Sequence, residues 1–165
     1  MVALKIEDAK AFTNGLFVGN LFDAFLLREA EITTYNRFTI DGRISRGYYS
    51  EEERAEKGLE DYSFWSTIRP ICFSLVKGKR LPESFRLVFQ LDREKTAAFI
   101  NSRVTGIQPE QVNGLYINVH FENKELKCVS GTSLKIFTLD KILENEWDEW
   151  VKRFLKENKV AFSIY

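Results

Sequence analysis

Three carboxylates occupy alternate positions along one segment: Glu29, Glu31 and Asp41. The segment alternates apolar and polar residues, so we predict two strands joined by a tight turn at residues 34–36, with Ile32 opposite Phe38. This register puts the three carboxylates on one face of the hairpin, with Arg37 and Arg43. Grouped carboxylates can perform acid–base catalysis or hold a hard cation, but charges of alternating sign are also typical of a solvated sheet face.

The densest run of basic residues consists of Lys77, Lys79 and Arg80, which follow an apolar, helix-like segment. We take these residues and Arg69, which lies in the same segment, as candidate binding residues for an anion or a nucleic acid, because phosphate contacts use local clusters of Lys and Arg. The alternative is structural, since cations near a helix C-terminus interact favourably with the helix dipole.

Other residues that carry chemistry are few. His120 is the single histidine, so a two-histidine metal site is impossible, and Cys72 and Cys128 lie in apolar segments that suit buried thiols. Residues 130–133, SGTS, favour a turn or bulge over a phosphate loop, because the segment lacks the lysine and the following helix of such a loop. No zinc, hydrolase or dinucleotide motif is present, so we assign no catalytic residue, metal or cofactor.

The composition favours one globular domain over residues 1–165. Lys and Arg number 24, equal to Asp and Glu, so no net charge attracts the chain to nucleic acid or to an anionic membrane. No signal peptide or membrane-spanning run is recognisable, and two isolated thiols suit a reducing compartment. We therefore expect a cytoplasmic protein.

The elements that must position these residues are short strands and amphipathic helices. We predict strands at residues 3–6, 26–33 and 37–44, a strand at 84–91, a hairpin turning at Asn123 and Lys124, and a final strand at 160–165. Helices are expected at 7–18, 64–77, 92–104 and 140–158, with Pro70 opening or kinking the second. Residues 50–61 are charged and predict an exposed loop or short helix, bracketed by Tyr48, Tyr49 and Tyr62. The fold class is α+β, an antiparallel sheet with about four helices.

The order strand, helix, hairpin occurs twice, from LKIEDAKAF to AEITTYNRFTIDGRI and from FQLDREKTAAF to VHFENKELKCVSGTS. This order resembles the repeated unit of sliding-clamp domains and suggests a pseudo-repeat. Clamps line their inner helices with Lys and Arg, whereas the first helix here carries Lys10 beside Glu7 and Asp8. The resemblance therefore does not extend to encircling DNA.

The segments EAEITT, FTIDG, IRPICFSLVKGKR, FRLVFQL and VNGLYINVHFENKELKCVSGTSLKIFTLDK resemble an uncharacterised family of bacterial, chiefly clostridial, proteins that is defined as a domain of unknown function. The resemblance spans most of the chain. It implies an intracellular bacterial protein and brings no activity and no site residues.

These observations leave three functions open. The first is a non-enzymatic binding or scaffolding protein that engages another protein, nucleic acid or a second copy of itself, through an exposed apolar patch or a self-complementary surface. The second is a small enzyme that uses the carboxylate cluster in a cleft. The third and weakest is a nucleic-acid contact module that uses the basic run after the second helix.

Overall fold

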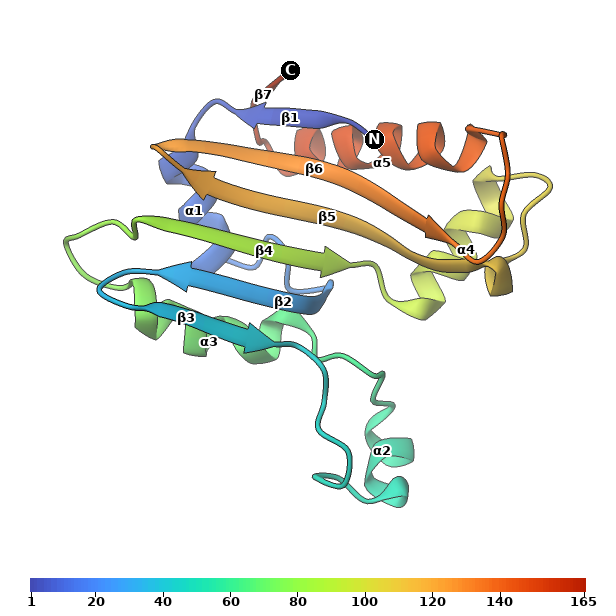
Figure 1. Cartoon of the computed structure of the whole chain (residues 1–165), viewed down its shortest axis with the longest axis horizontal. Helices are drawn as coiled ribbons and strands as arrows, with labels where there is room; N and C mark the ends of the chain where they lie inside the picture. Colours follow the sequence, from blue (N-terminus) through green and yellow to red (C-terminus); the bar gives the residue numbers. More distant parts are fainter.

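A single antiparallel sheet of seven strands runs through the computed structural model of residues 1–165 (Figure 1). The strand order is β3-β2-β4-β5-β6-β1-β7, so the middle of the chain supplies the middle of the sheet. The strands are β1 (Ala3–Ile6), β2 (Leu26–Thr33), β3 (Arg37–Asp41), β4 (Ser84–Gln90), β5 (Val112–Glu122), β6 (Glu125–Leu134) and β7 (Phe162–Ile164).

Helices cover one face of this sheet and leave the other open (Figure 1). Of the five α-helices, α1 (Ala9–Phe17), α3 (Trp65–Val76) and α5 (Ile142–Glu157) lie behind the strands, where α3 contacts β2 and α5 contacts β6. α4 (Arg93–Arg103) and the short 3-10 helix η1 (Pro109–Gln111) lie at one end of the sheet. None of the helices has both the length and the apolar character needed to cross a bilayer.

The core between sheet and helices is dominated by aromatic rings. Phe89 of β4 stacks on Phe22 at 4.5 Å between ring centroids and meets Trp65 of α3 edge-on at 5.4 Å. Buried aromatic pairs add about 0.5–1.5 kcal/mol each beyond the area that they remove from water. Because the Trp65 indole also donates to the carbonyl of Leu16 at 2.9 Å, α1, α3 and the sheet are joined at one point.

Both predicted hairpins are confirmed. Ile32 pairs with Phe38 across the β2–β3 turn, as the alternation requires. At the β5–β6 turn, Asn123 and Lys124 both take positive φ, 53° and 63°, which is the backbone of a two-residue type I′ turn whose twist matches that of the strands.

Several details differ from the prediction. The charged segment forms the short exposed helix that was one of its two predicted states, α2 (Glu51–Lys57), and this helix brings the α-helices to five instead of about four. Pro70 lies inside α3 and does not open it. The spacing of apolar residues along 65–76 puts Ile71 on one stripe with Trp65 and Cys72, but Ile71 is 55% exposed. Residues 130–133 do not form a turn, because all four are paired with β5 inside β6.

The strand–helix–hairpin order does occur twice, as β1-α1-β2-β3 and β4-α4-β5-β6. The strands of the two units pair differently, however. β1 lies beside β6, the second strand of the other hairpin, whereas β4 lies beside β2, the first strand of its counterpart. An exchange of the two units does not reproduce the sheet, so the resemblance to a clamp domain is approximate.

Candidate binding site on the open face of the sheet

The open face is polar because each central strand alternates across the sheet. Leu87, Val119 and Cys128 are fully buried against the helices, and their sequence neighbours point the other way. Cross-strand pairing sets these neighbours in rows. One row contains Glu29, Val88, Asn118 and Val129, and the next contains Glu31, Arg86, His120, Lys127 and Lys5.

The three carboxylates of the predicted cluster do share this face, but each has its own partner. Glu29 pairs with Arg86 at 2.7 Å, and Glu31 with Arg37 at 3.7 Å. Asp41 accepts a hydrogen bond from the backbone N–H of Arg43 at 2.9 Å. The negative charge of the cluster is therefore largely compensated on an open surface, which is a poor setting for an acid–base pair.

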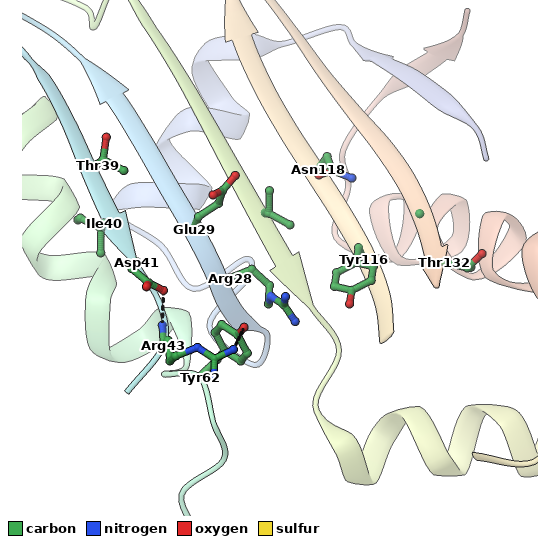
Figure 2. A pocket seen from close by; sticks show the side chains of 12 residues that line it. Arg28, Glu29, Thr39, Ile40, Asp41, Arg43, Tyr62, Tyr116, Asn118 and Thr132 are labelled. Carbon is green, nitrogen blue, oxygen red and sulfur yellow. Dashed lines mark hydrogen bonds between the residues drawn. The ribbon is translucent and has the colours of Figure 1, made fainter. Parts of the chain in front are cut away.

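A hollow of about 650 Å³ opens at the end of this face where β2 begins and β4 ends (Figure 2). One side is formed by the end of β3 and the segment around Tyr62, the other by β5 and β6. It is lined by Arg28, Glu29, Thr39, Ile40, Asp41, Arg43, Tyr62, Val88, Tyr116, Asn118, Gly131 and Thr132.

A β-bulge brings Arg28 into this hollow. Leu27 pairs with Phe89 and Glu29 with the adjacent Val88, so Arg28 is the extra residue. Strict alternation along residues 26–33 would put Leu27 on the polar face with Glu29 and Glu31, and this expectation is wrong: the bulge turns Leu27 inward, where it is fully buried. The same shift directs the Arg28 side chain to the open face, where it donates to Gln90 at 3.0 Å.

Aromatic rings surround the Arg28 guanidinium. Its Cζ lies 4.2 Å from the ring centroid of Tyr62 and 5.7 Å from that of Tyr116. Such cation–π contacts are worth about 0.5–2 kcal/mol, depending on exposure. They hold the guanidinium in place without neutralising its charge, and no carboxylate lies within ion-pairing distance of it.

The second cation in the hollow, Arg43, is positioned by the base of a projecting arm, residues 45–60, that contains α2 (Figure 1). Arg43 precedes the arm and Tyr62 follows it, and the two residues pair in an isolated antiparallel β-bridge. The Arg43 guanidinium also donates to the Tyr62 hydroxyl at 2.9 Å. Arg43 likewise has no carboxylate within ion-pairing distance. Tyr62 therefore holds both arginines at the same edge of the hollow.

Two glycines, Gly114 and Gly131, shape the hollow around Tyr116 because they carry no side chain. Gly131 stands directly opposite Tyr116 in the β5–β6 pairing, and a Cβ placed on it would meet only the Asn118 amide at 3.7 Å and the Tyr116 Cβ at 3.8 Å. The Tyr116 ring lies over Gly114, where a Cβ would come within 2.6 Å of it. Gly114 thus lets the Tyr116 ring lie against its backbone, and Gly131 leaves open space beside the tyrosine.

The predicted binding residues lie elsewhere. Arg69 is held in a two-pronged ion pair by Asp23, at 2.9 and 3.0 Å, and also approaches the Val18 carbonyl. Lys77, Lys79 and Arg80 are exposed and unpaired in the turn between α3 and β4. The structure therefore gives Arg69 a partner within the fold and leaves the three remaining basic residues free in solvent.

The other candidates have local partners. His120 lies 3.5 Å from Glu122 and opposite Lys127, and no group of three or more His, Cys, Asp and Glu side chains is arranged to hold a metal ion. Burial raises the pKa of the Cys72 thiol to about 12, and burial also raises the pKa of Cys128. Both thiols are therefore protonated at neutral pH.

In the sequence, Tyr48, Tyr49 and Tyr62 bracket the charged segment and could together line a ligand or anchor the segment. The structure separates them. Tyr48 and Tyr49 contact each other edge-on at 4.9 Å on the arm, while Tyr62 lies in the hollow. The sequence prediction did not include Arg28 or Tyr116, and it considered Gly131 only as part of the SGTS segment, residues 130–133. The doubled Leu26–Leu27 just before Arg28 nevertheless interrupts the alternation and signals a bulge.

The fold and this face define an α+β protein with a one-sided antiparallel sheet and a small polar hollow. The chain belongs to the family of unknown function DUF5721, which matches residues 15–163. The predicted membership in a family of unknown function is thus confirmed. No curated protein and no solved structure matches the chain.

Proposed function

We propose that this protein is a non-catalytic binding protein whose recognition surface is the open face of the sheet. The observation that supports this most is the hollow, which combines two arginines without ion-pair partners with tyrosine, asparagine and threonine side chains. Ligand sites are commonly concave and carry a few polar groups that fix the orientation of what they bind.

The enzyme alternative has less support. Of the three carboxylates, Glu29 and Asp41 line the hollow and Glu31 does not, and all three have partners. A general base must be free to take a proton from its substrate.

A scaffolding role predicts exposed apolar side chains. Such side chains occur away from the hollow, on α3 at Ile71 and Phe73 and after β6 at Ile136, Phe137 and Leu139.

Nucleic-acid contact through residues 77–80 remains a separate proposal, supported by the exposure of all three basic side chains. A cytoplasmic location is also part of the proposal. It is supported by two free, buried cysteines, which suit a compartment that keeps thiols reduced.

Amide NMR can test the proposal directly, because a chain of 165 residues gives resolved ¹⁵N–¹H spectra. The labelled protein is titrated with amino acids, sugar phosphates, nucleoside monophosphates, short peptides and short oligonucleotides. We expect the responding amides to lie on β2, β4, β5 and β6, with those on the outer side of α5 as the internal reference.

Two results would contradict the proposal. One is a set of responses confined to the helical face or to residues 77–80. The other is conversion of a bound compound into a product, lost in Glu29→Gln, which would replace binding by the enzyme alternative.

A further inference from the structure

We infer that the hollow between Arg28 and Arg43 binds the carboxylate or phosphate group of a small organic molecule. This inference rests on the proposed function, which it makes more specific. It starts from the pairing of charges on the open face, which differs between the hollow and the rest of the surface.

Away from the hollow, most charges of the face have a partner of opposite sign. These ion pairs are Arg37–Glu31, Lys5–Glu125 and His120–Glu122 when the histidine is protonated, and Glu29 at the margin of the hollow is paired with Arg86. Lys127 is an unpaired cation outside the hollow. The two arginines inside it, Arg28 and Arg43, are the only arginines of the face without an ion-pair partner.

Most donors of these two side chains are unused. A guanidinium has five N–H groups. Arg28 uses one with Gln90, and Arg43 uses one with the Tyr62 hydroxyl. Figure 2 shows both guanidinium groups beside that hydroxyl. Because hydrogen bonds from Arg to an oxyanion are charge-assisted, the remaining donors favour a carboxylate or a phosphate.

The carboxylates that line the hollow do not cancel this preference. Glu29 is already neutralised by Arg86 at 2.7 Å, and one oxygen of Asp41 faces a backbone N–H. With Arg86 included, three guanidinium groups stand against two carboxylates. These groups therefore carry a net positive charge, which favours an anionic ligand.

The shape of the hollow suits a small organic ligand. About 650 Å³ falls within the roughly 300–1,000 Å³ usual for such sites. The space above Gly131 and beside the Tyr116 ring can take an uncharged part of the ligand, and Tyr116 and Thr132 line the hollow with hydroxyl groups. A long polyanion is disfavoured, because the chain has equal numbers of acidic and basic residues.

The test uses phenyl phosphate as the probe and inorganic phosphate for comparison, in low-salt Tris at neutral pH. Binding is followed through the side-chain Nε–Hε signals of the arginines and through the backbone amides. We expect the signals of Arg28 and Arg43 to shift and phenyl phosphate to bind at least fivefold more tightly than phosphate.

Variants separate charge from shape. Arg43→Gln and Arg28→Gln should each weaken phenyl phosphate at least tenfold, whereas Arg37→Gln, at the far end of β3 on the same face, should not. Gly131→Val should fill the space beside Tyr116 and weaken phenyl phosphate more than inorganic phosphate. Dispersed amide spectra verify that each variant is folded. If replacing Arg28 disturbs the bulge, the Arg43→Gln variant still tests the inference, because Arg43 is exposed at the base of the arm.

Three outcomes would overturn the inference: no binding, binding that all variants retain, or equal affinity for both probes, which leaves no role for an organic part. The proposed function fails separately. It stands if other compounds shift amides of β2, β4, β5 and β6 on the open face, and it fails if nothing perturbs that face.

Discussion

Gly42, which joins β3 to the arm, packs so closely against the backbone of β2 that it allows no side chain. A Cβ there would lie 1.7 Å from the Leu27 carbonyl oxygen and 2.6 Å from its carbon. Both atoms belong to the backbone of a buried strand, so they cannot rotate away. In Gly42→Ala the two segments must separate by more than about 1 Å to reach even a tight contact.

This separation affects the backbone hydrogen bonds that join Gly42 to β2 and to the segment that follows the arm. Gly42 donates to the Arg28 carbonyl at 3.0 Å and accepts from the Ser63 N–H at 2.9 Å. Overpacking costs about 1–3 kcal/mol, and each lost bond about 1 kcal/mol more. We therefore expect Gly42→Ala to lower the free energy of unfolding by about 3–5 kcal/mol and Tm by about 10 °C.

Urea unfolding followed by circular dichroism measures this change, and Gly131→Ala is the matched control. Gly131 also lies in the sheet, but its Cβ would make ordinary contacts, so alanine there should be neutral or stabilise by up to about 1 kcal/mol. Equal losses in the two variants would refute the reasoning. So would an unchanged midpoint with faster exchange of the Ser63 amide, because the arm would then have detached without affecting the rest of the fold.

Three further predictions concern other parts of the molecule. Ser130→Ala should cost about 1–3 kcal/mol in urea unfolding, because the buried hydroxyl accepts from the Val2 N–H at 2.8 Å and donates to Asp148; an unchanged midpoint would contradict this. The raised pKa of Cys72 means that, as pH rises from 9.0 towards about 12, the unfolded thiol ionises while the folded one stays protonated, so stability falls in that window. Cys72→Ala should lessen the fall measured between pH 8 and 10.5, and an identical slope would argue against it. Alanine at the three basic positions of residues 77–80 should reduce the salt slope of oligothymidine binding by about 2, and an unaltered affinity would remove this loop as a nucleic-acid contact.

The sheet could be predicted where local pattern decides it. The β2–β3 and β5–β6 hairpins depend on strict alternation and on turn residues that accept the required backbone, so their registers follow from neighbouring residues alone. The order of β2, β4 and β5 depends instead on how hairpins pack onto helices. No local pattern contains that information.

The site was harder to predict, because its members meet through tertiary pairing. Arg69 was expected to bind an anion, and its partner Asp23 is 46 residues away. Arg28 and Tyr62 are brought together by the bulge in β2 and by the return of the arm. The broken alternation at Leu26–Leu27 was a usable local signal for the bulge, but it does not indicate which residues surround Arg28.

The bulge also explains why the hollow lies where it does. A regular β2 strand would direct residue 28 into the core, and an unpaired arginine there would be strongly destabilising. The bulge removes that conflict by turning Leu27 inward and Arg28 outward, at the strand end where Gly42 crosses. The same local irregularity that allows this sequence to bury Leu27 therefore places an unpaired cation between two tyrosines. Replacing Arg28 tests the ligand, whereas replacing Gly42 tests the scaffold that presents it.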